Sequence, residues 1–397
     1  MTEATSQRYG VAQQRDWNAL SNEEFRAAVR SMVEQHYPSA LRYPARRLRW
    51  DEQREWVMHL AKIGWIAPGW PLELGGMGLS PLKQLIYVEE FERWGVARYV
   101  DHGIVQVGPV ITRFGTDAQR QRWLPPILSV EHRWAQGYSE PGAGSDLASL
   151  RTTAVRDVDS YLISGQKTWS TLAHDATHIY VLARTDPKAK KQKGISFFLV
   201  DILSPGVTVR PIRDIAGHDE FCEVFFDQVR VPADQMIGAE NEGWTIAKSL
   251  LGHERINLGS PKLPEYGLQI LKSVARACNR TDDPVFQEQF AIVQLDVAHL
   301  ADSYALYTDR IARGEQLGPD VSMLKIWATE TFNRIANLIV ETAGEAGALI
   351  GEDVPVGDQH LDLLGTLYKA RPSTIYGGSN EIQRNILATA VLKLPRG

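Results

Sequence analysis

Three short segments combine glycine with hydroxyl, amide and aromatic side chains. Residues 136–146 read QGYSEPGAGSD, residues 165–171 read GQKTWST, and residues 376–385 read YGGSNEIQRN. A glycine-rich turn lets backbone N–H groups approach a polar ligand closely. A tryptophan followed by two hydroxyl residues can cover an aromatic ring and donate hydrogen bonds to its heteroatoms. In the third segment a glycine pair leads into a predicted helix, whose first N–H groups can face an anion. Taken singly, each segment is more typical of an ordinary turn or helix cap.

Glu254 is the first candidate for proton transfer. Residues 250–258 read LLGHERINL, which puts leucines three and four residues before Glu254 and four residues after it. On a helix these positions share one face, so the carboxylate is expected to lie among apolar neighbours. A carboxylate partly removed from water is suited to taking a proton from a weakly acidic C–H group. The alternative is a structural Glu254–Arg255 pair, but adjacent helix residues point about 100° apart.

Composition excludes several classes of protein. The chain has 397 residues, 44% of them hydrophobic and 23% charged, with a net charge of -5. These values are typical of globular domains and give no electrostatic reason to expect a nucleic-acid partner. Two cysteines, Cys222 and Cys278, are too few for a disulfide framework or a zinc site, so no metal is expected. The polar first 14 residues lack the apolar core of a signal peptide, and no apolar run approaches the ~20 residues of a membrane span. We therefore expect a cytoplasmic protein.

The hydrophobic periodicity changes twice along the chain. Residues 22–130 show helical spacing, broken by prolines and by a glycine-rich loop at 75–78. Residues 151–236 read as short β-branched and aromatic runs between turn formers, which predicts a small antiparallel barrel or sandwich. Helical spacing returns after residue 243 and is expected to hold to the end. The prediction is an α+β protein with a helical domain at 1–130, a β domain at 131–238 and a helical domain at 239–397.

Common catalytic motifs are missing. The sequence has no phosphate-binding GxxxxGK[ST] loop, no HExxH and no GxSxG. The glycines at 142 and 144 lack the third glycine of a dinucleotide-binding fingerprint and precede predicted strands, so a nicotinamide fold is not supported.

Together the segments resemble the acyl-CoA dehydrogenase family, flavoenzymes that oxidise acyl-CoA thioesters at the α,β bond. The resemblance covers residues 22–396. Beyond the three glycine-containing segments it includes WPLELGGMGL at 70–79, EVFFDQVRVP at 223–232 and ENEGW at 240–244. It implies an N-terminal helical domain, a middle β-barrel or sandwich domain and a C-terminal four-helix bundle. This order agrees with the periodicity.

The resemblance also implies FAD, held between the β domain and the C-terminal helices. The residues that match the family's FAD contacts are Gln136, Tyr138, Ser139, Ser145, Trp169, Ser170, Thr171, Ser379, Asn380 and Glu381. In the family, the first three belong to a strand that hydrogen-bonds the flavin ring, and 169–171 cover the isoalloxazine. Ser145 also matches a contact to the CoA thioester arm, and Arg255 matches a residue near the bound substrate.

One departure concerns the catalytic base. Many family members carry a glutamate just after the tyrosine that matches Tyr376, but here that position is Gly377. Its backbone N–H can still meet the thioester oxygen, although it cannot accept a proton. A subset of the family places the base on the first helix of the C-terminal domain, at the position of Glu254. Glu381 is a rival base, yet it matches a cofactor contact. We also expect Gly259, Pro261 and Pro264 to break or kink the helix after Leu258.

A second departure concerns assembly. Many members grip the cofactor of a neighbouring subunit with an RxxFG-type loop, and residues 280–286 fit this pattern only loosely, with Arg280 as the candidate contact. The resemblance implies a homotetramer, and a heterotetramer with a related subunit is the alternative. An electron-transfer flavoprotein is the implied electron acceptor.

Two other functions stay open at this point. One is a non-catalytic or partner-dependent subunit of a heteromer, which Gly377 favours. The other is a flavin oxidase on the same fold, against which the retained Ser145 and Arg255 argue.

Overall fold

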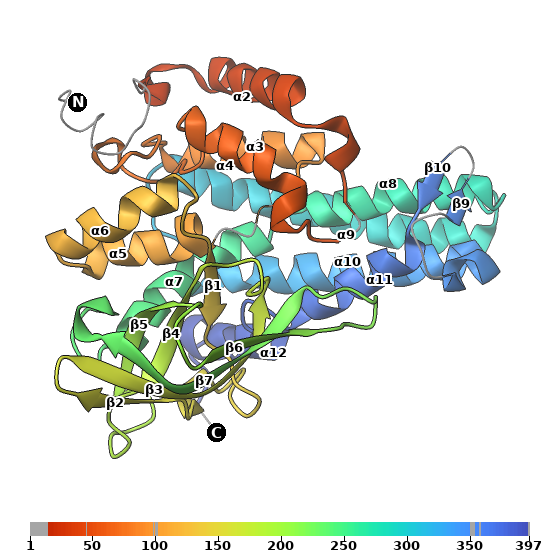
Figure 1. Ribbon diagram of the computed structural model, residues 1–397. Helices are drawn as coiled ribbons and strands as arrows, with labels where there is room; N and C mark the ends of the chain where they lie inside the picture. The colour runs from red at the N-terminus through yellow and green to blue at the C-terminus, as the bar shows by residue number, and fades with distance from the viewer. Residues whose placement is uncertain are drawn as a thin grey trace. The chain divides into compact units, whose positions relative to one another are not determined.

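The computed structural model describes residues 15–44, 46–97, 99, 102–349, 354–356 and 359–395, with backbone only at 250–255, 257, 354–356 and 359–361. The chain divides into two compact units, residues 1–250 and 251–397. The first contains helices followed by a sheet, and the second is mostly helical (Figure 1). Among the described residues, no helix is both long and apolar enough to cross a membrane.

The first unit begins with helices whose ends are capped by their own sequence. Ser21 and Glu24 form a capping box at the first, and Thr116 and Gln119 form another. A π-helical segment, Gly103–Val107, runs into α5. The helices are α2 (Asn22–His36), α3 (Trp50–Lys62), α4 (Pro81–Trp94), α5 (Gly108–Phe114) and α6 (Asp117–Leu128).

The sheet of the first unit has eight strands in the order β6-β7-β3-β2-β4-β5-β8, with β1 pairing with β4. The strands are β1 (Trp134–Gly137), β2 (Thr153–Asp157), β3 (Ser160–Thr171), β4 (His178–Arg184), β5 (Ile195–Asp201), β6 (Val207–Ile212), β7 (Phe221–Pro232) and β8 (Met236–Ile237). Most pairs are antiparallel, as expected, but β1–β4 and the short β2–β4 contact are parallel. β1 precedes the range 151–236 for which antiparallel strands were predicted, and within that range only the short β2–β4 contact departs from the prediction.

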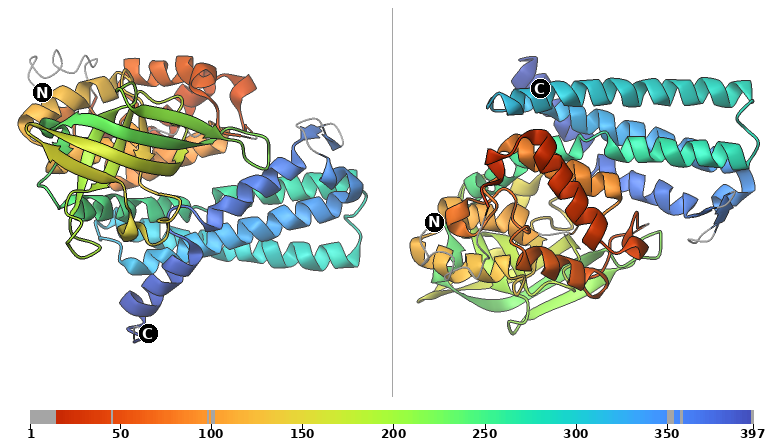
Figure 2. Two further views of the ribbon diagram at one scale, coloured as in Figure 1. Left: turned by 60° about the horizontal axis from the view of Figure 1, so that its bottom comes forward. Right: turned by 90° about the horizontal axis from the view of Figure 1, so that it is seen from above.

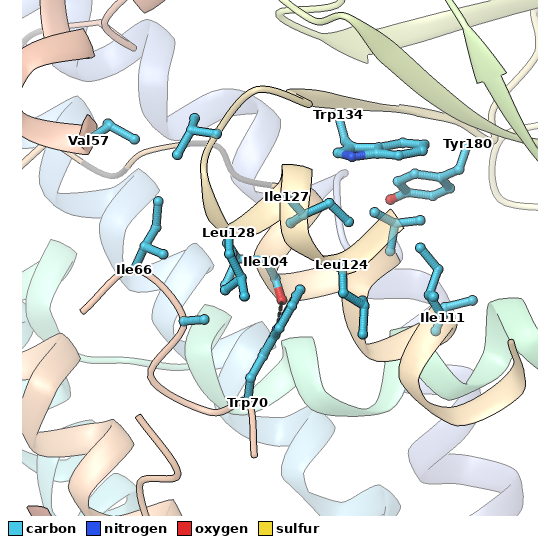
Figure 3. Close-up of a cluster of buried hydrophobic side chains, with 14 of the residues drawn as sticks. Val57, Ile66, Trp70, Ile104, Ile111, Leu124, Ile127, Leu128, Trp134 and Tyr180 are labelled. Carbon is cyan, nitrogen blue, oxygen red and sulfur yellow. Dashed lines mark hydrogen bonds between the residues drawn. The ribbon is translucent and has the colours of Figure 1, made fainter. Parts of the chain in front are cut away.

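Two cores meet at β4. Tyr180 and Leu182 pack with the N-terminal helices, whereas Ile179 and Val181 pack with the neighbouring strands. Successive strand residues point to opposite faces, so β4 is buried on both sides. Figure 3 shows Tyr180 and Trp134 among the helical side chains, and the Trp70 indole donating to the Ile104 carbonyl at 2.8 Å. This packing ties the π-helical segment to the core.

The second unit is built on three long helices, α8, α9 and α10, which run alongside one another (Figure 2). Its elements are α8 (Lys262–Ala277), α9 (Pro284–Ala312), α10 (Ser322–Ala343), β9 (Val354–Val356), β10 (Gln359–Leu361), α11 (Leu363–Ala370) and α12 (Asn380–Ile386). The β9–β10 hairpin interrupts the helices, so the expectation of helix to the end of the chain is wrong there. α7 (Gly243–Leu258) spans the division between the units.

Candidate functional site

The first group of candidate residues lies in the first unit, where β1 ends beside β3. Gln136 pairs with Tyr180 across β1 and β4, and its side-chain amide donates to the Tyr180 hydroxyl at 2.9 Å. The same amide lies 3.3 Å from the carbonyl oxygen of the Gln106 side chain. Tyr138 is buried, and the Ser139 carbonyl accepts from the Thr168 backbone N–H at 2.9 Å. The partly buried Gln136 side chain thus belongs to one polar cluster.

The turn after β1 is fixed by Glu140. Its buried carboxylate accepts from the backbone N–H groups of Arg151 at 2.6 Å and Thr152 at 2.9 Å, and from the Lys167 ammonium at 2.8 Å. Beyond it, a Cβ atom built at Gly142 or Gly144 would meet nothing within 4 Å. Ser145 is exposed. The turn therefore has a rigid base and a glycine-rich rim that faces open space.

Lys167 is a buried cation beneath this turn. It is 0% exposed and also donates to the Tyr138 carbonyl at 3.1 Å. Burial lowers the pKa of Lys167 to about 8, against the opposing effect of the Glu140 charge. Burial alone would raise the pKa of Glu140, but the nearby Lys167 charge and the hydrogen bonds to Glu140 hold it below its usual value. The pair is ionised at neutral pH and joins β3 to the end of β1.

Trp169 adopts an unusual backbone conformation. Its φ is +61°, and the β3–β7 register shifts between Lys167 and Ser170. A bulky residue with positive φ is rare and occurs where the surrounding structure forces it. The bulge leaves the indole 59% exposed, with its ring edge-on to Phe221 at 5.9 Å. Ser170 next to it is buried, and its hydroxyl donates to the Gln136 carbonyl at 2.9 Å.

The structure therefore brings two of the predicted segments together. Gln136, Ser139, Trp169 and Ser170 lie around one junction of β1 and β3, with Thr171 at the end of β3. The Trp-Ser-Thr triplet forms the end of β3.

The second group of candidate residues lies in the second unit, in the turn at residues 377–380. Gly377 has φ +65° and Gly378 has φ +83°. A Cβ at Gly377 would lie 2.3 Å from Cδ1 of Leu258, the last residue of α7. The carbonyl of Gly377 accepts from the Gln383 side chain at 3.0 Å, and the carbonyl of Gly378 accepts from Lys325 at 3.0 Å. Only glycine fits this conformation and this approach of α7.

Residues 379–381 begin α12. The Ser379 hydroxyl caps the helix by accepting from the Ile382 N–H, and the Asn380 side chain is buried against α10. Glu381 is exposed, and the hydrogen bond from Ser379 holds the pKa of its carboxyl below the usual value. An exposed carboxylate that stays ionised is a weak base, so Glu381 is poorly suited to remove an α-proton.

The remaining predicted residues lie on α7 or after α8. The backbones of Glu254 and Arg255 lie on α7, but their side chains are outside the described part of the structure. α7 ends at Leu258 as predicted, and Pro261 caps the next helix. Arg280 forms a local ion pair with Asp283 at 2.6 Å, in the turn between α8 and α9.

Sequence reasoning missed the buried polar residues that support each of the two groups. Lys167 lies inside a segment already singled out, but the pattern gave no reason to expect it to be buried. Lys325 stands beside Leu324 and three residues before Ala328, on a buried helix face. A lysine at such a position is a signal that could have been used.

Comparison with known proteins identifies the family. Residues 21–131, 135–229 and 241–392 match the N-terminal, middle and C-terminal domains of acyl-CoA dehydrogenases. Acyl-CoA dehydrogenase IpdE1 of Mycobacterium tuberculosis is 40% identical over 385 residues, which cover 94% of this chain and 98% of that protein.

Solved structures similar to this chain also include acyl-CoA dehydrogenases. The Tcur3481-Tcur3483 steroid ACAD has a TM-score of 0.85 at 31% identity, covering 95% of this chain and 98% of the matched chain. The ChsE4-ChsE5 complex from Mycobacterium tuberculosis has a TM-score of 0.78 at 33% identity, with the same coverage. With matching domains in matching order, the chain belongs to the acyl-CoA dehydrogenase family of FAD-dependent flavoproteins.

Proposed function

We propose that the chain dehydrogenates an acyl-CoA thioester to the 2-enoyl-CoA, with Glu254 as the base. Glu254 takes the α-proton, the Gly377 N–H donates to the thioester oxygen, and Arg255 and Ser145 contact the substrate. FAD, when bound, supplies the acceptor for the β-hydride, and an electron-transfer flavoprotein takes the electrons. We also propose that the chain has three domains, at 1–130, 131–238 and 239–397. Its proposed location is the cytoplasm.

The approach of α7 to Gly377 carries this proposal. The Leu258 side chain lies where a side chain at position 377 would begin. Leu258 stands four residues after Glu254, about one helical turn along α7. The helix that carries Glu254 thus passes next to the position where other family members place their glutamate, which supports Glu254 as its replacement.

The residues present fit FAD. The glycine rim at 142 and 144 faces open space, and the exposed Trp169 indole offers a flat surface for a ring. We propose that Gln136, Tyr138, Ser139, Ser145, Trp169, Ser170, Thr171, Ser379, Asn380 and Glu381 bind FAD. The Gln136, Ser170 and Asn380 side chains bond within the protein, so we assign their contribution to positioning the backbone. Arg280 stays a proposed contact to FAD in a neighbouring subunit.

We infer that the acyl group is polycyclic, because two-chain steroid ACAD structures are among the solved relatives at 31% identity or more. The test is an anaerobic titration of the purified, FAD-loaded chain with straight-chain and steroid-derived acyl-CoAs, following the flavin absorbance. Bleaching by a steroid-derived thioester is expected, and bleaching only by straight-chain thioesters would contradict the polycyclic assignment.

Glu254→Gln tests the base. We expect the variant to retain FAD and lose flavin reduction by at least about 1,000-fold, since the proposal gives the α-proton to the Glu254 carboxylate and a glutamine amide cannot accept it. Glu265→Gln is the matched control, because Glu265 pairs with Lys262 on the neighbouring helix and has no role in the proposal. Wild-type reduction rates in Glu254→Gln would move the base elsewhere.

A partner-dependent subunit is the second candidate function, favoured by Gly377 and by two-chain relatives such as the ChsE4-ChsE5 complex. In that case the chain purified alone would bind little FAD, and co-expression with a related chain would restore both the colour and the reduction. Oxygen consumption during turnover would instead indicate a flavin oxidase.

A further inference from the structure

Lys325 is buried directly behind the turn at residues 377–380. It lies in the first turn of α10 and is 0% exposed. Its ammonium donates to the Gly378 carbonyl at 3.0 Å and to the Asn380 side-chain oxygen at 2.8 Å. Complete burial of a lysine is rare because removing the charge from water is costly. A lysine in this place therefore calls for a role that a hydrophobic residue would not fill.

The contacts of Lys325 belong to a closed network. The Asn380 amide, 2% exposed, donates to the Thr329 hydroxyl at 3.1 Å, and that hydroxyl donates to the Lys325 carbonyl at 2.8 Å. Gln383, 1% exposed, donates to the Gly377 carbonyl at 3.0 Å. Two consecutive carbonyls of the turn, at 377 and 378, are thus fixed from behind by side chains.

Fixing the carbonyls also fixes the N–H groups. A trans peptide is planar, with its N–H directed opposite to its C=O. With the Gly377 and Gly378 carbonyls anchored to Gln383 and Lys325, the N–H groups of Gly378 and Ser379 point away from the protein interior behind the turn. The Gly377 N–H, the proposed donor to the thioester oxygen, belongs to the preceding peptide. The side chains behind the turn therefore act on this donor through the Gly377 backbone, which joins the two peptide planes.

We propose that Lys325 is a positioning residue for the Gly377 turn, and that its ammonium lies behind the backbone that carries the donor to the thioester oxygen. This inference rests on the proposed function. Removal of the α-proton moves negative charge onto the thioester oxygen. A fixed cation in a desolvated site favours that charge, and fixed donors bind it without rearranging during the reaction.

Lys325→Met tests the proposal, because methionine keeps a similar volume and helix propensity while removing the charge and the hydrogen bonds to the Gly378 carbonyl and Asn380. Lys83→Met is the matched control. Lys83 is a second buried lysine, 4% exposed, and donates to the carbonyls of Trp17 and Leu20 in the first unit. Each variant is measured for FAD content, melting temperature and the rate of flavin reduction by the acyl-CoA that bleaches the wild type.

The decisive measurement uses the 3-thia analogue of that acyl-CoA. Sulfur at the β position has no hydride to give, so the bound analogue can lose its α-proton but cannot be dehydrogenated. Its anion beside oxidised flavin gives a long-wavelength absorbance band, which reports the apparent pKa of the bound ligand. In Lys325→Met we expect this pKa to rise by at least about one unit, and flavin reduction to slow about 100-fold, the usual effect of losing one oxyanion donor. Lys83→Met should leave both unchanged.

Wild-type ligand ionisation and reduction in Lys325→Met would overturn the proposal. If that variant does not retain FAD, Lys325→Gln decides, since it keeps a donor and removes only the charge. An unchanged ligand pKa in Lys325→Gln would overturn the electrostatic role. Failure of the proposed function is visible separately, because the wild type itself would then neither bleach nor ionise the analogue.

Discussion

Gly377 has a left-handed backbone conformation and a close neighbour, Leu258. Each would add a separate energetic cost to any side chain placed at this position. A side chain at positive φ costs roughly 1–2 kcal/mol, and a Cβ here would also overlap the Leu258 side chain. We expect Gly377→Ala to destabilise the protein by more than this backbone cost. Gly314 has φ +76° with nothing within 4 Å of a Cβ, so Gly314→Ala measures the backbone cost alone.

Urea unfolding gives the loss of unfolding free energy in each variant. The difference between the two losses is the cost of the Leu258 contact at position 377. If the two variants lose equal stability, α7 does not press on position 377 and the argument for Glu254 weakens. A glutamate placed at 377 in the Glu254→Gln background should also fail to restore flavin reduction.

At position 169 we expect glycine to give a more stable protein than alanine, which is the opposite of the usual order in a strand. Glycine in a strand is ordinarily less stable than alanine by roughly 0.5–1 kcal/mol. At φ +61° only glycine is free of strain, so Trp169→Gly should be more stable than Trp169→Ala. Val155, an exposed residue of β2 with ordinary strand geometry, should show the normal order and serves as the control. Equal ranking at both sites would mean that the bulge relaxes once the indole is removed.

These residues show where sequence reasoning ends. Motif similarity located Trp169 and Gly377, and the structure places them in the expected segments. The positive φ of Trp169 follows from a register shift between β3 and β7, strands separated by fifty residues of chain, and local sequence does not report such pairing. Lys167 and Lys325 were not predicted as buried, because lysine is usually a surface residue and only tertiary contacts reveal its partners.

Among the elements, α2 and α4 are joined by a single buried carboxylate. Glu90 on α4 is 1% exposed and pairs with Arg26 and Arg30 of α2, both at 3.0 Å, and with Arg93 at 2.7 Å. Burial would raise the pKa of Glu90, but the three guanidinium groups outweigh burial and lower it to about 2. Three cations around one carboxylate hold the two helices in register.

The pH dependence of this junction follows from that depressed pKa. The stabilisation is complete above the unfolded pKa of about 4.5 and is lost as the pH falls toward 2. Glu90→Gln should therefore cost about 3 kcal/mol of unfolding free energy at pH 7, and the deficit should shrink between pH 4.5 and 2. Glu89→Gln, which removes a partly exposed carboxylate paired with Arg26 alone, should cost much less. A pH-independent deficit in Glu90→Gln would indicate a packing effect instead.

Element prediction succeeded where one period ran without interruption. Within the predicted β region at 151–236, the apolar and β-branched runs at 195–200 and 207–212 form β5 and β6, and turn formers flank both. β2, with its exposed Val155 and Arg156, lacks a clean apolar alternation and was not predicted. The β9–β10 hairpin is too short to break the helical pattern of the sequence around it.

At the scale of the whole molecule, α9 leaves apolar side chains on its outer face. Val285, Ile292, Leu295 and Leu306 are all more than half exposed, while Val293, Val297 and Leu300 are buried on the opposite side. The exposed four are separated by seven, three and eleven residues, the spacing of a helix seam that packs against another helix. We expect this stripe to pack against a second copy of this chain.

The double variant Ile292→Glu/Leu295→Glu should lower the molar mass measured by sedimentation or light scattering, because two buried carboxylates would face each other or an apolar partner. Val155→Glu/Val158→Glu is the matched control: it places the same charges on exposed apolar positions next to the β2–β3 turn and should leave the mass unchanged. The measurement is made on the chain alone and on the chain co-expressed with a related acyl-CoA dehydrogenase. Loss of mass only in the co-expressed sample would assign α9 to the heteromeric contact, and loss in the chain alone would assign it to self-association. An unchanged mass in both would place assembly on another surface and leave the apolar stripe without a role in it.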